Sequence, residues 1–324
     1  MKRVLITGAG GFIGSHLTEK CVERGYAVKA FVHYNSKNNW GWLENSPSKK
    51  AIEVLTGDIR DYDSVFAAMQ GVDTVLHLAA LIGIPYSYVS PLAYIHTNIE
   101  GTYNVLQAAR MLQTENVIIT STSETYGSAR YVPIDEAHPS QGQSPYAATK
   151  IAADQLALSY FRSFGMPVKI VRPFNTFGPR QSARAFIPNV IIQILNGQRR
   201  LKVGNLFPTR DLTFVQDTVA GFLAIADCRE AVGTVTNIGM GVEISMHRLA
   251  STIADLMGVQ MQFFSDEKRL RPEKSEVDRL LCNNEKILRI TNWKPHWDLH
   301  SGLENTITWF REKRDLYKPD IYNV

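Results

Sequence analysis

Short apolar runs alternate with amphipathic segments through the first half of the chain. The apolar runs are rich in β-branched residues, as expected of strands that are buried on both faces of a parallel sheet. The segments between them have apolar residues at helical spacing, and this repetition predicts a parallel sheet covered by helices, with right-handed crossovers. The predicted strands cover residues 3–7, 27–32, 51–58, 73–80, 116–120 and 168–174, and the predicted helices cover residues 12–25, 61–71, 91–112 and 144–165.

The alternation becomes less regular from about Phe174 onward, and neither a Gly/Ser linker nor an internal repeat is present. We therefore expect an α/β fold, with a Rossmann-type doubly wound parallel sheet and a smaller mixed α/β C-terminal lobe. The sheet domain is predicted at residues 1–175 and most of the lobe at residues 176–324, and the chain is expected to return to the sheet domain at about 212–240. Further helices are predicted at residues 187–197, 245–258 and 299–313.

Composition and charge narrow the class of protein. The 324 residues are 44% hydrophobic and 20% charged, as in ordinary globular proteins. A net charge of +4, with no basic run interleaved with aromatics, argues against nucleic-acid binding. No Cys-x-x-Cys pair is present, so we expect neither a disulfide framework nor a metal site. We also expect a cytoplasmic protein, because no stretch is typical of a membrane span or a signal peptide. The cysteines are Cys21, Cys228 and Cys282.

The most informative motif is the glycine-rich stretch VLITGAGGFIGSHL near the N-terminus. Gly8, Gly11 and Gly14 follow a predicted strand directly and extend across the start of a predicted helix. Glycines permit a tight turn and let backbone amides approach a pyrophosphate, and the helix N-terminus adds free N–H donors. In this context the motif predicts a dinucleotide site, with Phe12 and Ile13 among its contacts.

The end of the second predicted strand indicates which dinucleotide binds. An NAD site usually offers a carboxylate there for the ribose hydroxyls. The sequence FVHYNSKNN has no acidic residue at this place, and a 2′-phosphate would be accommodated by Lys37 and its polar neighbours. This pattern favours NADP, with NAD as the alternative. The predicted contacts are His33, Asn35, Ser36 and Lys37.

The segment SPYAATKIAADQ places Tyr146 and Lys150 four residues apart on a predicted helix, so both side chains face the same way. By itself this spacing also fits an amphipathic helix with a surface lysine. A tyrosine has an ordinary pKa of about 10, and a neighbouring ammonium group lowers it by favouring the phenolate. Such a phenolate can take a proton from a substrate hydroxyl while hydride leaves the same carbon for a nicotinamide.

The stretch IITSTSETYG runs from a predicted buried strand into a hydroxyl-rich turn that carries one carboxylate, Glu124. Desolvating a carboxylate is costly, so its place directly after a core strand needs a reason. Glu124 is either a solvated turn residue or a base aimed at a substrate. Thr122 and Ser123 precede it at a strand end, where α/β folds bind their ligands.

Several motifs together resemble those of the extended short-chain dehydrogenase/reductase family. They are the spacing G-x-x-G-x-x-G, the Tyr-x-x-x-Lys pair, GDIRD after the third predicted strand and HLAA after the fourth. The resemblance spans the whole chain and favours an enzyme over a non-enzymatic dinucleotide-binding sensor, because such sensors can lack the tyrosine or the lysine. It implies further cofactor contacts at Asp58, Ile59, Leu78, Ala79 and Ala80, with the adenine near the first two.

The turn STSETYG resembles that of nucleotide-sugar 4,6-dehydratases, most closely those acting on guanosine sugars. The resemblance implies oxidation at C4 of the sugar, removal of the acidified C5 proton by Glu124, loss of water from C6 and return of the hydride to C6. Related epimerases carry no acid in this turn. Some dehydratases have Asp where this chain has Ser123, so the acid that protonates the leaving hydroxyl stays open. The implied catalytic set is Thr122, Ser123, Glu124, Tyr146 and Lys150.

The same resemblance implies that polar residues outside this turn contact the substrate. Two arginines far apart in the sequence, Arg210 and Arg271, can clamp a diphosphate through forked, charge-assisted hydrogen bonds. In the segment AALIGIPYSYVSP, Ser87 and Tyr88 are expected to cover the hexose. The full set of implied substrate contacts is Ser87, Tyr88, Asn175, Arg184, Arg210, Arg271 and Glu273.

The segment YNSKNNWGWLE resembles bacterial dehydratases that act on N-acetylglucosamine nucleotides and supply nonulosonate or deoxy-amino sugars for surface glycans. The expected function is therefore NADP-dependent 4,6-dehydration of a nucleotide-activated N-acetylhexosamine, with UDP-N-acetylglucosamine favoured over GDP-N-acetylglucosamine. A 4-epimerase or a reductase on the same fold is the alternative. The predicted helices at 91–112 and 144–165 correspond to a dimer interface in this family, which implies a homodimer or a higher homo-oligomer.

Overall fold

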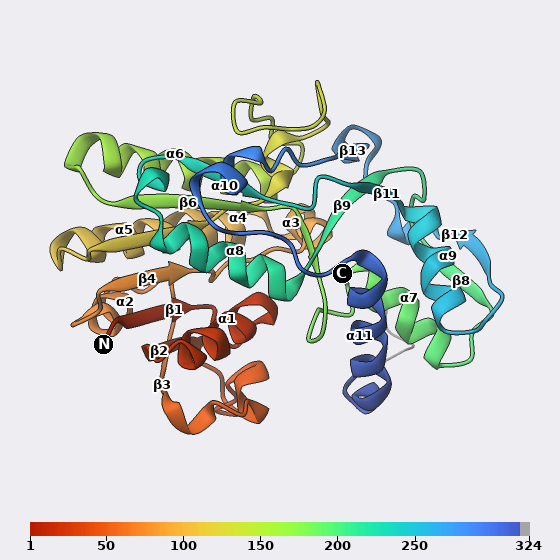
Figure 1. The fold of residues 1–324 in the computed structure, drawn as a ribbon, viewed down its shortest axis with the longest axis horizontal. Coiled ribbons are helices and arrows are strands. Elements are labelled where there is room, and N and C mark those ends of the chain that lie inside the picture. Colours follow the sequence, from red (N-terminus) through yellow and green to blue (C-terminus); the bar gives the residue numbers. More distant parts are fainter. Residues whose placement is uncertain (318–324) are drawn as a thin grey trace.

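The computed structural model describes residues 1–317, in which a seven-stranded sheet with helices on both faces adjoins a smaller lobe (Figure 1). The strand order is β10-β6-β5-β4-β1-β2-β3, and every neighbouring pair runs parallel. The predicted doubly wound parallel sheet is therefore confirmed. Its strands are β1 (Arg3–Thr7), β2 (Ala27–His33), β3 (Ile52–Gly57), β4 (Thr74–His77), β5 (Asn116–Thr120), β6 (Val168–Pro173) and β10 (Val235–Ile238).

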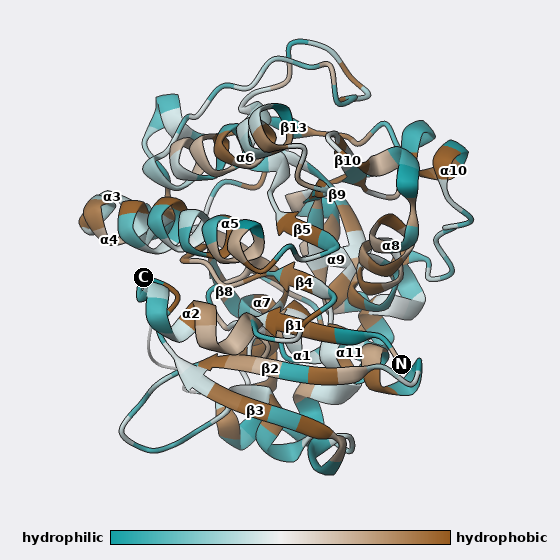
Figure 2. Ribbon diagram, turned by 90° about the vertical axis from the view of Figure 1, so that its left-hand side faces the viewer, coloured by the Kyte–Doolittle hydropathy of each residue, from teal (hydrophilic) through white to brown (hydrophobic). Residues whose placement is uncertain are grey.

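Helices cover both faces of the sheet, and each face has its own apolar core. One core includes Leu17 of α1 and Phe222 of α8, and the other includes Leu106 of α5 and Ala157 of α6. Figure 2 shows the strands mainly in the hydrophobic colour between these helices. The helices that pack on the sheet are α1 (Phe12–Glu23) and α8 (Val215–Asp227) on one face, and α2 (Tyr62–Met69), α5 (Gly101–Met111) and α6 (Pro145–Phe164) on the other.

The helix predicted at 91–112 differs from the expectation in one respect, because a π-helical turn interrupts it. The segment consists of α4 (Pro91–Tyr94), the π-helical turn η3 (Ile95–Glu100) and α5. Asn98 in this turn is buried. Its side-chain oxygen accepts a hydrogen bond from the amide of Leu81, and its side-chain nitrogen donates to the carbonyl oxygen of Leu81 and to the hydroxyl of Thr149. The turn thus connects the loop after β4 to α6, and π-helical turns of this kind are frequent at functional sites.

The smaller lobe shares a continuous apolar core with the α1 and α8 face of the sheet, through Phe177, Phe214 and Phe310 among others. The predicted division into two domains stays a prediction. The remaining helices are α3 (Ile84–Val89), α7 (Phe186–Leu195), α9 (Met246–Leu256), α10 (Glu285–Ile290) and α11 (Leu299–Glu312). The remaining strands are β7 (Asn175–Phe177), β8 (Arg200–Val203), β9 (Thr209–Phe214), β11 (Glu243–Ser245), β12 (Gln262–Ser265) and β13 (Arg279–Leu280). Short helical turns are η1 (Gly41–Asn45), η2 (Lys49–Ala51), η4 (Ser123–Tyr126), η5 (Arg229–Ala231), η6 (Glu267–Arg269), η7 (Glu273–Ser275) and η8 (Arg314–Leu316).

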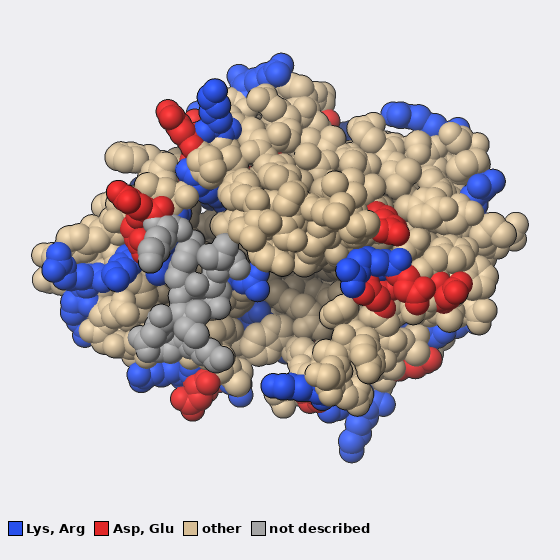
Figure 3. Space-filling model, turned by 180° about the vertical axis from the view of Figure 1, so that it is seen from behind, with Lys and Arg blue, Asp and Glu red and all other residues tan. Residues whose placement is uncertain are grey.

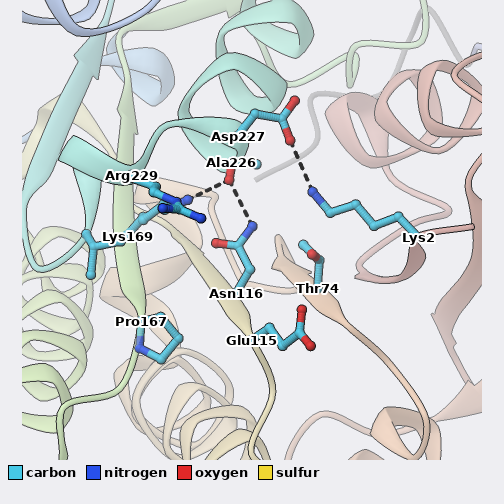
Figure 4. A pocket seen from close by; sticks show the side chains of 10 residues that line it. Lys2, Thr74, Glu115, Asn116, Pro167, Lys169, Ala226, Asp227 and Arg229 are labelled. Carbon is cyan, nitrogen blue, oxygen red and sulfur yellow. Dashed lines mark hydrogen bonds and ion pairs between the residues drawn. The ribbon is translucent and has the colours of Figure 1, made fainter.

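A hollow of about 390 Å³ lies at the amino ends of β4, β5 and β6 (Figure 4). Lys169 and Asn116 both donate to the carbonyl oxygen of Ala226 at the end of α8, over 2.5 Å and 2.9 Å, and Lys2 pairs with Asp227 over 3.1 Å. Burial lowers the pKa of Lys169 to about 8. Cations at a helix C-terminus stabilise its free carbonyls. The polar side chains of this hollow therefore cap α8 and attach it to the sheet.

Charged side chains of both signs are spread over the surface, and Figure 3 shows one face on which small basic and acidic groups lie among other residues. Within residues 1–317, no helix is both long and apolar enough to cross a membrane. The same part of the chain contains no group of three His, Cys, Asp or Glu side chains placed to hold a metal ion.

His77, at the end of β4, is a buried imidazole between two hydroxyl groups. Its Nδ1 lies 2.8 Å from Oγ1 of Thr7, and its Nε2 lies 3.2 Å from Oγ1 of Thr102. Burial lowers the pKa of His77 to about 3. The folded protein therefore keeps this ring neutral at pH values where an unfolded chain, with an ordinary histidine pKa of about 6.5, is protonated.

The His77 environment predicts a loss of stability in mild acid. Between the unfolded and the folded pKa the unfolded chain binds one more proton, so the free energy of unfolding falls as the pH is lowered. From pH 6.5 to pH 5 this group contributes a loss of about 1.5 kcal/mol. Urea denaturation at both pH values measures it. The loss should shrink in H77Q and persist in the surface control H300Q; equal losses in all three proteins would contradict the assignment.

Candidate active site

The glycine-rich turn after β1 lies close to two other backbone segments. Gly8 has φ +69°, and a Cβ at this position would lie 2.8 Å from the amide nitrogen of Ala79, at the end of β4. A Cβ at Gly14 would lie 2.2 Å from the carbonyl oxygen of Gly8. Gly11 precedes α1, which begins without a side-chain cap, so its first N–H groups are available to a ligand. The turn thus fits a pyrophosphate, as the sequence predicts.

A pocket of about 260 Å³ lies between this turn and the loop after β2. The side chain of Asn35 bonds within its own loop, donating to the carbonyls of His33 and Asn39. Ser36 and Lys37 are exposed and do not line the pocket. No carboxylate, lysine or arginine is among its lining residues, which are Gly10, Gly11, Val32, His33, Asn35, Asn39, Trp40 and Gly41.

Two further segments predicted to contact a cofactor lie at the ends of β3 and β4. Asp58 is paired with Arg60 at 2.5 Å, and this guanidinium lowers the pKa of the Asp58 carboxyl. Ile59 is buried. The amides of Leu78 and Ala79 both donate to the hydroxyl of Thr7 over 3.1 Å, so the end of β4 is fixed to the end of β1. Ala80, like Leu78 and Ala79, is half-buried.

The hydroxyl-rich turn after β5 forms η4, and the turn begins at Thr122. The hydroxyl of Thr122 accepts from the amide of Glu124 over 3.3 Å and is also a hydrogen-bonding neighbour of the Tyr146 phenol. Ser123 is buried, and the Glu124 side chain is 12% exposed. The charge of Glu124 acts on the buried phenol of Tyr146. The structure therefore brings Thr122, Glu124 and Tyr146 together at one strand end.

Burial raises the pKa of the Tyr146 phenol above its ordinary value, and the charge of Glu124 raises it further, while the Thr122 hydroxyl opposes them. This direction is opposite to the one expected from the sequence. The Lys150 ammonium, which was expected to favour the phenolate, donates to the carbonyl oxygen of Thr120 over 2.5 Å. Burial lowers the pKa of Lys150, because a charged group in an apolar environment loses its hydration.

A buried ion pair beneath the β5 turn is a feature that the sequence analysis missed. Oδ2 of Asp154 accepts from Ser121 over 2.6 Å and from Arg172 over 2.7 Å, and both charged side chains are almost completely buried. The guanidinium of Arg172 also lies over the ring of Tyr126, 4.5 Å from its centroid. These contacts fix the end of β5 to α6 and β6. The position of Asp154, one helical turn after Lys150 on α6, was the feature of the sequence from which a buried charge could have been predicted.

Four alternating charges lie beside the β5 turn. Nη1 of Arg271 is 3.8 Å from Oε2 of Glu124 and 3.8 Å from Oε1 of Glu276, and Nη2 of Arg210 is 3.5 Å from the same oxygen of Glu276. Burial lowers the pKa of Arg210, which is 6% exposed. The structure therefore brings both predicted arginines together with Glu124. The carboxylate between the two arginines is Glu276, which was not predicted from the sequence. The predicted Glu273 is exposed.

The other residues predicted to contact the substrate lie in different environments, some buried and some exposed. Within residues 1–317, Oδ1 of Asn175 is buried and has no hydrogen-bond partner. The hydroxyl of Tyr88 lies 2.5 Å from that of Ser275 and connects α3 to the smaller lobe. Ser87 is fully buried and donates to the carbonyl of Ile84 in its own helix, so the structure does not place it in the site. Arg184 is exposed.

A parallel sheet with a glycine turn after its first strand, and a tyrosine and lysine at one edge, defines the extended short-chain dehydrogenase/reductase class. A family model described as GDP-mannose 4,6 dehydratase matches residues 5–306, and the chain belongs to this family of nucleotide-sugar dehydratases and epimerases.

Proteins with similar sequences and structures include nucleotide-sugar dehydratases and epimerases. The chain is 30% identical over 320 residues to a dTDP-glucose 4,6-dehydratase of Streptomyces antibioticus, covering 98% of this chain and 94% of that protein. A solved dTDP-glucose 4,6-dehydratase from Streptomyces venezuelae with NAD bound has a TM-score of 0.88 and 29% identity, covering 98% and 99% of the two chains. A UDP-N-acetylglucosamine 4-epimerase from Methanobrevibacter ruminantium, in complex with UDP-N-acetylmuramic acid, has a TM-score of 0.85 and 28% identity, covering 96% and 99%.

Proposed function

We propose that the chain catalyses the 4,6-dehydration of a nucleotide-activated N-acetylhexosamine. The observation that carries this proposal is the position of Glu124, a carboxylate that is mostly shielded from solvent beside the phenol of Tyr146. Epimerisation at C4 requires no carboxylate there, whereas elimination of water requires a base for the C5 proton and an acid for the C6 hydroxyl.

The residues of the site have separate roles in this reaction. The glycine turn and the start of α1 would hold a nicotinamide dinucleotide, which would supply a hydride acceptor that also serves as hydride donor. The positive ring of an oxidised nicotinamide would favour the phenolate of Tyr146 against the effect of burial, and this phenolate takes the proton of the C4 hydroxyl. Thr122 is the polar neighbour of Tyr146, and Lys150 lies one helical turn further along α6. Glu124 then removes the C5 proton, which the C4 ketone has made acidic. Ser123 is too weak an acid to protonate the leaving hydroxyl by itself, so Glu124 or a water molecule supplies that proton.

The remaining predicted contacts support a nucleotide diphosphate as the activating group. Arg210 and Arg271 lie near each other through their shared neighbour Glu276, and their guanidinium groups suit forked recognition of a diphosphate. The unpartnered side-chain oxygen of Asn175 is a further polar contact. We favour UDP-N-acetylglucosamine over GDP-N-acetylglucosamine, and the similarity to an epimerase of UDP-N-acetylglucosamine supports this choice.

We also propose that the chain forms a homodimer through α5, α6 and the segment before α5. Large apolar side chains on these elements are exposed, which is costly unless another surface covers them. They are Leu92, Ile95, Tyr103, Met111 and Phe164. A cytoplasmic location stays a prediction.

The dehydratase proposal is tested by incubating the protein with UDP-N-acetylglucosamine or GDP-N-acetylglucosamine and measuring the masses of the products by mass spectrometry. We expect a product lighter by one water, without added NADPH. In E124Q the base is lost while size and polarity are kept, so a 4-keto sugar that retains its C6 hydroxyl should accumulate. The matched control E304Q changes an exposed carboxylate on α11 and should form the dehydrated product normally.

Two outcomes would contradict this proposal. An isobaric product would favour the epimerase alternative. Complete dehydration by E124Q would remove Glu124 from its assigned role, even if the natural chain forms the expected product.

Tyr146 is tested separately from the carboxylate. Y146F keeps the buried ring but removes the proton acceptor, so kcat should fall by about 10²- to 10⁴-fold, the usual contribution of a general base. The amount of bound cofactor should stay near that of the natural chain. Y131F changes an exposed tyrosine and serves as the control. Unchanged turnover in Y146F would exclude the phenol from the chemistry.

The identity of the cofactor is a separate proposal. The sequence favours NADP, but Lys37 does not line the pocket beside the glycine turn, and the similar Streptomyces venezuelae structure contains NAD. We therefore propose NAD. Denaturing the purified chain and identifying the released dinucleotide should yield NAD, and K37A should alter the preference for NAD over NADP by less than about twofold, because one exposed lysine contributes little. Released NADP, together with a tenfold loss of NADP affinity in K37A, would restore the original prediction.

A further inference from the structure

The loop after β2 lies directly on the glycine turn. A Cβ at Gly41 would lie 2.4 Å from the carbonyl oxygen of Gly10, and one at Gly10 would lie 2.4 Å from that of Trp40. The amide of Trp42 donates to the carbonyl of Gly10 over 3.0 Å. Two backbone segments far apart in the sequence are therefore in contact with no side chain between them. We call residues 35–42 the clasp.

The clasp is ordered by its own side chains. The amide group of Asn35 donates to the carbonyl of Asn39 over 2.7 Å, and its oxygen accepts from the amides of Lys37 and Asn39. The oxygen of the Asn39 side chain accepts from the amide of Gly41 over 2.8 Å. Each of these bonds closes a short loop of backbone, so the clasp has a defined shape.

The far end of the clasp is held by α11, from the C-terminal part of the chain. The rings of Trp42 and Trp309 pack edge to face, with centroids 5.3 Å apart. Trp309 also packs against Phe310, which is fully buried in the core. Figure 1 shows α11 on the side of the molecule that carries the segment between β2 and β3. The position of the clasp therefore depends on a helix more than 250 residues away in the sequence.

The 260 Å³ pocket lies between the two contacting segments, with Gly10 and Gly11 on one side and the clasp on the other. In dinucleotide sites of this fold the adenosine ribose occupies the end of the second strand. We propose that the clasp closes over this half of the cofactor, and that Trp42 and Trp309 are positioning residues that keep it closed between turnovers. The inference rests on the proposed function, in which the same hydride is stored and returned, so that turnover requires no exchange of cofactor.

The test measures the rate at which the cofactor leaves the purified protein. The chain is loaded with an etheno-adenine analogue of NAD, chased with excess NAD and followed by fluorescence. Release should be about tenfold faster in W42A and W309A, and faster still in G41A, whose new Cβ must displace the Gly10 carbonyl. W42F retains an aromatic ring and should restore slow release. The control G25A has the same left-handed strain, φ +74°, but open space around its Cβ, and should release at the natural rate.

The outcomes separate the clasp from the proposed function. Equal release rates in the natural chain, W42A and W309A would overturn the clasp, while a retained cofactor would leave the proposed function intact. A natural chain that binds no dinucleotide would overturn both. Circular dichroism shows which variants fold. If W42A or W309A does not fold, W42L and W309L carry the test, because each keeps an apolar side chain but loses the ring contact. Release as slow as in the natural chain from both leucine variants would count against the clasp.

Discussion

The site depends on one constraint of the fold, which is that neighbouring parallel strands end at the same edge of a sheet. β1 ends in the glycine turn, β4 in the amides of Leu78 and Ala79, and β5 in the turn that carries Glu124. Strand pairing fixes the distances among these turns before any ligand is present. Residues that are more than a hundred positions apart therefore meet without long loops having to find one another.

Buried polar groups join the segments that meet at that edge. The Thr7 hydroxyl joins β1 to β4, Asn98 joins the loop after β4 to α6, and the pair of Asp154 and Arg172 joins β5 to α6 and β6. Buried charges and amides are costly to leave unpaired, so each network is stable in only one arrangement. The same networks contact α6, and they restrict the positions of Tyr146 and Lys150.

Features that depend on local sequence were predictable, and features that depend on long-range contact were not. Six strands of the sheet, the glycine turn and the spacing of Tyr146 and Lys150 follow from periodicity and local turn chemistry, whereas β10 and the strands outside the sheet were not predicted. The role of Glu276 beside both arginines was not visible, because it lies only three positions after the exposed Glu273 and the folded segment decides which of the two faces inward. The raised pKa of Tyr146 was missed for a similar reason, since burial is a property of the whole fold.

The position of α8 and β10, about two-thirds of the way along the chain, has a consequence for biosynthesis. Both elements complete the sheet beside β6, although they follow it by more than forty residues. While the ribosome is still making residues 174–214, the apolar face of β5 and β6 has no cover from α8, and β6 is an open edge. The nascent chain therefore exposes apolar surface until α8 has been made and an unpaired strand edge until β10 has been made. A chaperone that shields both during that interval would act before Arg271 of the proposed site is synthesised.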